Sequence, residues 1–114
     1  MAGFIQVTDH QCWSVSNWVY WGLMDHLLAA LVGDSQAAKS VEVCKWTQSM
    51  SLPLLQSDDK ITADKILIAL EEVAPKCAAG TLACKVDGRR LDEDSQRQFN
   101  EAALDLVDIL RKLR

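Results

Sequence analysis

The apolar stretch from Cys12 to Val32 constrains the fold more than any other part of the sequence. Fifteen of its 21 residues are apolar, and Asp25 is its one firm charge. When it is plotted at about 100° per residue, the large apolar side chains occupy more than half of the helix circumference. The stretch is therefore predicted to form one long, mostly buried helix around which the rest of the chain packs.

Three further helices are predicted from capping residues and prolines. Asp34 or Ser35 is expected to cap a helix over residues 35–50, which ends before Pro53. Thr62 is expected to cap a third helix that Pro75 closes. The last helix is expected to begin after Asp92, and its apolar positions recur at intervals of three and four residues: Phe99, Ala103, Leu106, Leu110 and Leu113.

The fold class follows from these helices together with the lack of a strand pattern. No alternating run of β-branched residues flanked by hairpin turns stands out, and the sequence has no internal repeat. A chain of 114 residues is long enough for one hydrophobic core. We expect a single all-α domain over residues 1–114, built as a compact bundle of four to five mostly antiparallel helices.

Charge narrows the kinds of partner. The net charge is −4 and the isoelectric point is near 5.0, with the basic residues scattered, so no nucleic-acid partner is expected. A basic protein would suit this chain better. Residues 1–57 carry only four acids and two bases, so this half supplies the core or an apolar interface, and a homodimer stays possible.

The sequence favours a cytoplasmic protein. The start of the chain lacks the basic residues of a secretory signal. Residues 12–32 are long enough to span a membrane, but Asn17, Gly22, Asp25 and His26 within them argue against it. The four cysteines are accordingly expected to be reduced and buried, although a pairing of Cys77 with Cys84 stays open.

Motifs for catalysis, metals and cofactors are not evident. His10 and Cys12 are the one close pair of metal donors, and there is no CxxC motif. His26 could activate Cys44 or Cys12 only if the fold brought them together, and burial would disfavour a thiolate. We expect no metal, no cofactor and no enzymatic activity.

Two candidate binding surfaces remain. The first is the narrow polar face of the long helix, formed by Trp18, Gly22, Asp25, His26 and Ala29. Glycine inside a helix costs about 1 kcal/mol relative to alanine, so Gly22 is expected to permit a close approach. The approaching group is either a partner or another helix of the same bundle.

The second surface is the polar face of the last helix. It carries an acidic series opposite the apolar stripe, with Leu104 at its edge: Asp94, Glu101, Asp105 and Asp108. Like charges at this spacing repel one another, and a basic ligand would reverse the effect. The alternative is a solvated face that Arg97 and Lys112 partly compensate. Trp46, on one edge of the second helix, is a further candidate contact.

These features predict a protein that binds another protein and holds or inhibits it by occlusion. Acidic side chains would steer a basic partner, and Trp18 or Trp46 would set the dissociation rate. In size, acidity and helicity the chain resembles bacterial immunity proteins, which plug a toxin's active site; this resemblance is one of type and implies an antitoxin-like inhibitor. The alternatives are a structural homodimer and a helical enzyme or ligand-binding protein whose pocket is lined by Trp13, Tyr20, Trp21 and His26.

Overall fold

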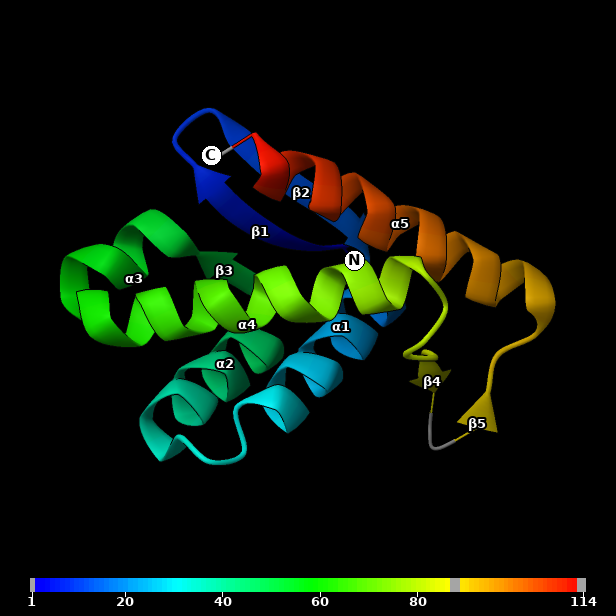
Figure 1. The fold of residues 1–114 in the computed structure, drawn as a ribbon, viewed down its shortest axis with the longest axis horizontal. Coiled ribbons are helices and arrows are strands. Elements are labelled where there is room, and N and C mark those ends of the chain that lie inside the picture. The colour runs from blue at the N-terminus through cyan, green and yellow to red at the C-terminus, as the bar shows by residue number, and fades with distance from the viewer. Residues whose placement is uncertain (1, 87–88, 113–114) are drawn as a thin grey trace.

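The computed structural model describes residues 2–86 and 89–112, in which helices pack with a small sheet (Figure 1). The strands and helices follow one another along the chain as β1 (Ala2–Thr8), β2 (Gln11–Ser16), α1 (Asn17–Ala30), α2 (Ser35–Thr47), β3 (Ser49–Ser51), α3 (Leu52–Asp58), α4 (Lys60–Ala78), β4 (Lys85–Val86), β5 (Arg89–Arg90) and α5 (Glu93–Arg111).

The prediction of an all-α bundle is wrong, because the N-terminal segment forms strands. β1 is the middle strand of a three-stranded sheet in the order β2-β1-β3. It pairs antiparallel with β2, with Ile5 opposite Trp13, and parallel with β3, with Ile5 opposite Met50. The fold is therefore mixed, with helices covering a small sheet.

Alternation along β1 explains why this segment is a strand. Gly3, Ile5 and Val7 are buried, whereas Phe4 between them is exposed. Side chains of a strand point alternately to its two faces, so a period of two buries one set of residues and exposes the other. Trp13 also faces the core from β2, where it is 3% exposed. The predicted helix over residues 12–32 consequently begins only at Asn17 and ends at Ala30.

The first turn of α1 packs directly on β1. A Cβ atom at Gly3 would collide with the ring of Tyr20, so only glycine allows this approach. The Tyr20 hydroxyl donates a 2.7 Å hydrogen bond to the carbonyl oxygen of Cys44, which ties α1 to the end of α2. The sheet, α1 and α2 are thus held together around one buried side chain.

The helix ends agree with the sequence prediction at some caps and differ at others. Asp34 accepts a hydrogen bond from the Ala37 amide, and Asp92 accepts one from the Ser95 amide, so both predicted caps are confirmed. α2 ends at Thr47, before the predicted residue 50. The buried stripe on α5 is confirmed for Phe99, Ala103, Leu106 and Leu110, whereas Leu113 lies outside the described residues. The Asp87-Gly88 pair, whose sequence predicts a turn, also lies outside them.

The prediction for α4 is wrong at both ends. Asp59, and not Thr62, caps this helix. At the other end, Pro75 lies inside the helix, which continues to Ala78. Proline removes one backbone donor near the end of the helix, and Ala79 N still bonds to the Pro75 carbonyl, so the last turn is completed.

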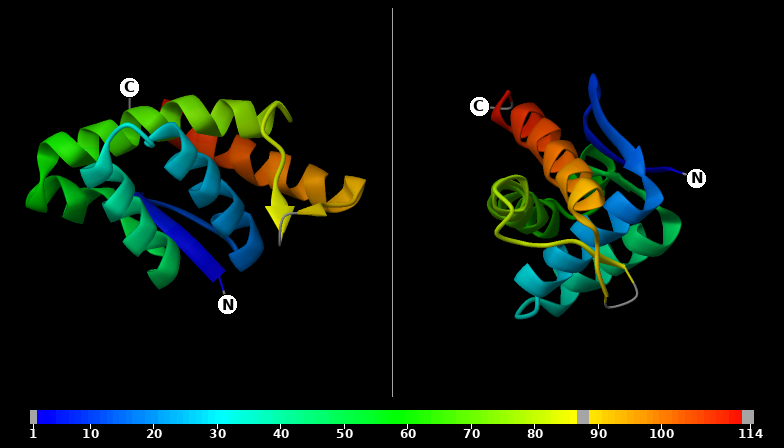
Figure 2. Two further views of the ribbon diagram at one scale, coloured as in Figure 1. Left: turned by 90° about the horizontal axis from the view of Figure 1, so that it is seen from below. Right: turned by 90° about the vertical axis from the view of Figure 1, so that its right-hand side faces the viewer.

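α4 is the central helix of the molecule. It contacts α1, α2, α3 and α5. α1 and α2 lie on one side of it and α5 on the other (Figure 2). The core draws on most of the helices and on the N-terminal sheet. Its largest fully buried side chains include Ile5, Tyr20, Met24, Met50, Ile66, Leu70, Phe99 and Leu106.

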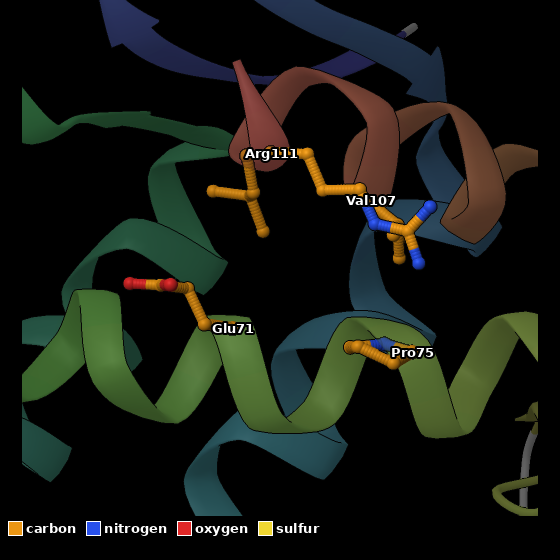
Figure 3. A pocket seen from close by; sticks show the side chains of 5 residues that line it. Glu71, Pro75, Val107 and Arg111 are labelled. Carbon is orange, nitrogen blue, oxygen red and sulfur yellow. The ribbon is translucent and has the colours of Figure 1, made fainter. Parts of the chain in front are cut away.

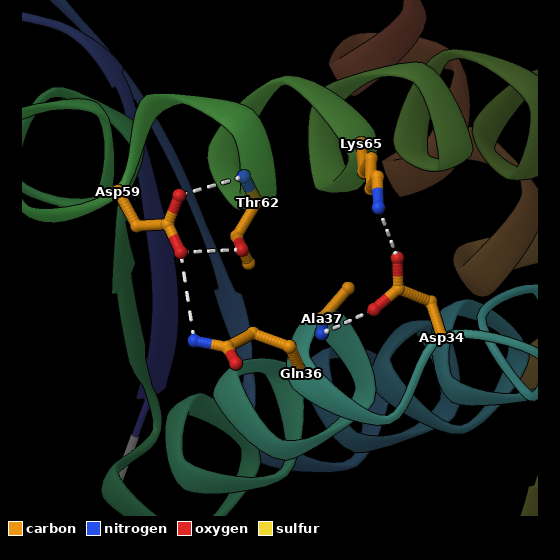
Figure 4. A network of polar contacts seen from close by, with 6 residues as sticks. All are labelled: Asp34, Gln36, Ala37, Asp59, Thr62 and Lys65. Atoms are coloured by element: carbon orange, nitrogen blue, oxygen red, sulfur yellow. Dashed lines mark hydrogen bonds and ion pairs between the residues drawn. The ribbon is translucent and has the colours of Figure 1, made fainter.

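Two capping aspartates also link α2 to α4 (Figure 4). Asp34 caps α2 and accepts a 2.7 Å bond from Lys65 of α4. Asp59 caps α4 through Thr62 and accepts a 3.5 Å bond from Gln36 of α2. The hydrogen bond from Lys65 lowers the pKa of Asp34, and the hydrogen bonds from Thr62 lower the pKa of Asp59.

The apolar stretch over residues 12–32, which is long enough to span a membrane, is split between a strand and a helix in this fold. Residues 12–16 belong to β2, and α1 has 14 residues, whereas a span needs about 20. Within the described ranges, no helix combines the length and the apolar character needed to cross a bilayer.

Candidate functional site

Gly22, in the first predicted surface, is covered by other parts of the same chain. A Cβ atom at this position would lie 2.5 Å from Sγ of Cys84 and 3.1 Å from the Phe99 ring. The close approach that the glycine permits is therefore internal, made by the segment before β4 and by α5. Gly22 is a packing residue, and no partner can reach it.

The other members of this face are divided between the interior and the surface. His26 is half-buried, and its Nε2 lies 2.7 Å from the carbonyl oxygen of Ala83. Trp18 is half-buried against the core, whereas Asp25 and Ala29 are exposed. The five residues therefore do not form one continuous accessible surface.

Trp46 is the exposed aromatic residue of α2, with 65% of its surface accessible. Its ring meets that of Trp21 edge-on, with 5.3 Å between the centroids and 80° between the planes. Nζ of Lys45 lies beside both rings and donates a 2.7 Å hydrogen bond to Asp25. Lys45 was not predicted as a site residue, and Trp21 was predicted only for the alternative ligand pocket, because their meeting depends on how α1 packs against α2.

The residues of the second predicted surface lie on α5. Glu101, Asp105 and Asp108 are exposed on this helix, and no described residue forms an ion pair with any of them; we call these three residues the acidic row. Asp94 differs, since it is bonded to Arg97 at 2.8 Å. Leu104, also predicted, is 50% exposed.

A groove lies between α4 and α5, with a cavity volume of about 250 Å³. Its lining comprises Glu71 and Pro75 from α4 and Val107, Leu110 and Arg111 from α5 (Figure 3). Val107 and Leu110 are almost fully buried and form its apolar floor. The side chain of Arg111 extends along the groove toward Val107.

The acidic row lies further round α5 than the residues that line the groove, and Asp108, three positions before Arg111, is its member nearest to them. Residues three and four positions apart are neighbours on a helix surface. Leu104 therefore lies between Val107, which lines the groove, and the pair Glu101 and Asp108, whereas Asp105 is further round the helix. On α4, Ile68 is 64% exposed and lies seven residues before Pro75, on the same helical face. An apolar hollow with exposed apolar margins thus lies on one side of Leu104, and carboxylates that form no ion pair with a described residue lie on the other.

The two exposed candidate surfaces lie on different sides of the molecule. Trp46 is on α2, which packs against α1 and one side of α4, whereas the acidic row is on α5 (Figure 1). A single small partner that covers the α5 surface would not reach Trp46. The structure therefore separates Trp46 from the acidic residues, although the sequence had suggested that both contact the same partner.

The cysteines are free, and three of them are buried: Cys44, Cys77 and Cys84. Burial raises the pKa of the Cys77 thiol to about 12 and that of Cys84 to about 11. Burial also raises the pKa of Cys44. These thiols therefore stay protonated, a state that does not support nucleophilic catalysis, and the described hydrogen bonds of His26 include none to a cysteine.

Two of the residues proposed for a ligand pocket, Trp13 and Tyr20, are used for packing. Tyr20 is fully buried with its hydroxyl bonded to Cys44, and Trp13 donates a 2.8 Å hydrogen bond from Nε1 to the Ala102 carbonyl. In the part of the chain that the structure describes, no three side chains of the His, Cys, Asp or Glu type gather as a metal site would require.

Comparison with known proteins gives no match: no protein-family model, curated protein or solved structure is similar to this chain.

Proposed function

We propose that this protein binds a basic protein partner through the face formed by α4 and α5 and inhibits that partner by occlusion. The observation that carries the proposal is the apolar groove beside the acidic row. Charges that have no partner within the described chain are available to an external one, and the hollow can receive an apolar side chain.

The partner segment that fits this face is an amphipathic basic helix or extended peptide. One of its apolar side chains would enter the hollow over Val107 and Leu110, while lysine or arginine side chains meet Asp108 and Glu101. Arg111 at the same groove disfavours a segment that is basic along its whole length. The partner is therefore expected to carry its positive charges on one side of an apolar anchor.

The two parts of the surface have different kinetic roles. The acidic row raises the rate of association, an effect that added salt screens. The anchor in the hollow, together with Leu104 at its edge, sets the lifetime of the complex. We place the anchor here, and not at Trp18 or Trp46, because Trp18 is half-buried and Trp46 lies on another side of the molecule.

The proposal includes an inhibitor of the immunity-protein type in the cytoplasm. The net charge of −4 and the small size of the chain support a compact acidic plug. The four free thiols suit a reducing compartment.

The test is affinity capture of the tagged protein from its native cells, followed by binding measurements with the purified partner. Three proteins are compared: the wild type, the α5 variant E101Q/D105N/D108N, and the control D9N/E42Q/D58N, which removes the same charge from exposed residues elsewhere. We expect the wild type and the control to retain a basic partner and to inhibit its activity. The α5 variant should lose most of the association rate. Equal binding by all three proteins contradicts the site, and recovery of the protein alone contradicts the function.

A matched pair of leucine variants tests the apolar part of the surface. Leu104→Ala should increase the dissociation rate, whereas Leu54→Ala on α3 should not, although both leucines are at least half exposed. An unchanged dissociation rate for Leu104→Ala would remove this residue from the proposed interface.

A further inference from the structure

Trp21 and Trp46 form two walls of a corner between α1 and α2. Their ring planes are inclined at 80° and their centroids are 5.3 Å apart. The rings meet edge to face, and the face of each ring carries the negative potential that attracts a cation. Neither residue belongs to the α4–α5 surface.

The chain's own ammonium group occupies this corner. Nζ of Lys45 lies over both rings, 5.0 Å from the centroid of Trp21 and 6.0 Å from that of Trp46. Its third neighbour is Asp25, whose carboxylate accepts a 2.7 Å hydrogen bond from it. Two aromatic faces and a carboxylate around one positive charge are the components of an aromatic cage for cations.

The outer side of the corner is accessible from solvent. Trp46 is 65% exposed, and the side chain of Asp25 is 53% exposed. Lys45 itself is more enclosed, at 19%. An external cation can therefore approach the rings from the solvent side if the Lys45 side chain moves out on its flexible stem.

We propose that this corner binds a methylated ammonium group and that Lys45 is its intramolecular competitor. A primary ammonium is strongly hydrated, so bringing it from water onto the rings is costly. A trimethylated ammonium has a larger apolar surface and is recognised by aromatic cages without hydrogen bonds. The ligand class is thus a quaternary ammonium, either free, as in choline, or on a trimethyllysine side chain.

Competition by Lys45 predicts how a substitution of this residue changes the ligand affinity. In the wild type the ligand must displace an ammonium that is already paired with Asp25. The apparent affinity is therefore the intrinsic affinity multiplied by the small fraction of molecules whose corner is open. Removing the Lys45 side chain should therefore tighten binding. A residue that merely supported the rings would have the opposite effect.

The experiment measures binding by calorimetry for three probes: choline, a short peptide containing trimethyllysine, and the same peptide with unmodified lysine. We expect Lys45→Ala to bind a methylated probe about tenfold more tightly than the wild type, the order that cation–π energies allow. Lys39→Ala, which removes an exposed lysine from the same helix, should behave as the wild type. Binding of the peptide alone would assign the site to a modified protein, and binding of choline as well would assign it to free quaternary ammonium compounds.

Trp46→Ala tests whether the exposed ring is required for binding of the methylated probes. Because Trp46 is largely exposed, its removal should leave the fold intact, which the circular dichroism spectrum checks, and binding should fall below detection. Trp18→Phe, on α1 but outside the corner, should retain it. The proposal is overturned if Lys45→Ala binds neither methylated probe, if Trp46→Ala binds them unchanged, or if the unmodified peptide binds equally well.

Discussion

Gly22 of α1 and Cys84 before β4 pack so closely that a Cβ atom on the glycine would lie 2.5 Å from the cysteine sulfur. Real Cβ atoms do not approach a neighbour this closely, so the absence of a side chain at Gly22 positions the segment that connects α4 to α5. The same segment supplies the Ala83 carbonyl that His26 contacts. A glycine that resembled part of a binding face therefore organises the interior.

Gly22→Ala should destabilise the protein by about 1 kcal/mol, because an overpacking cost of about 1–3 kcal/mol outweighs the gain in helix propensity. Urea unfolding monitored by tryptophan fluorescence measures the change. Gly33→Ala is the control, since no atom lies within 4 Å of a Cβ there. In the Cys84→Ala background the cost of Gly22→Ala should shrink; equal costs in both backgrounds would show that the sulfur is not the obstacle.

Asp34→Asn should flatten the dependence of stability on pH in acid. The Lys65 bond lowers the pKa of Asp34 in the folded state, so its contribution is fully present above the unfolded pKa of about 3.9 and is lost as the pH falls through the folded value. The variant keeps a capping oxygen but no charge. We expect it to be less stable than the wild type at pH 7 and equal to it near pH 2 in urea titrations.

Asp58→Asn is a matched control for this experiment, because Asp58 is exposed and ends α3 without capping a helix. Its stability should follow that of the wild type over the whole range. A constant difference between Asp34→Asn and the wild type at every pH would exclude the ionised carboxylate as the source.

One thiol should react with Ellman's reagent in the native protein. Cys12 is exposed on β2, whereas burial raises the pKa of Cys44, Cys77 and Cys84 and excludes the reagent. The reaction should reach one equivalent per chain in buffer and four in denaturant, and Cys12→Ser should abolish the native reaction. A second rapid equivalent would show that the core opens at one of the buried cysteines.

Tyr20→Phe should cost about 1 kcal/mol, the net value of one hydrogen bond. Burial raises the pKa of Tyr20 well above its usual value, so the folded state keeps the proton after the unfolded chain begins to release it near pH 10. The wild type should therefore lose stability above about pH 10, and its advantage over Tyr20→Phe should shrink there. Thermal unfolding of both proteins from pH 8 to pH 11 measures this; a constant difference would contradict it.

Local patterns in the sequence were sufficient for α5. Capping chemistry predicts that Asp92 begins the helix. The helical period predicts that Phe99 and Leu106 are buried and that the acidic row is exposed. Both depend on neighbours only a few residues away. The exposure of the candidate residues on this helix could be predicted for the same reason.

Residues 12–16 show where local patterns are insufficient. Trp13 falls on the apolar side of a helical wheel and also alternates correctly for a strand, so the apolar run conceals the change of period at Asn17. Pairing with β1 decides between the two, because Ile5 lies opposite Trp13 only in the folded sheet. Strand formation depends on a partner strand, and helical periodicity alone does not reveal one.

The sequence by itself determined α1 from residue 17 onward, α2, the middle of α4 and α5, together with two helix caps and the acidic surface of α5, since each depends on short-range geometry; α3 was not predicted. The tertiary structure alone decided the N-terminal sheet, the burial of Gly22, the groove between α4 and α5 and the meeting of Trp21 with Trp46. Each of these joins residues that are distant in the chain, and only packing of the elements determines which side chains then touch.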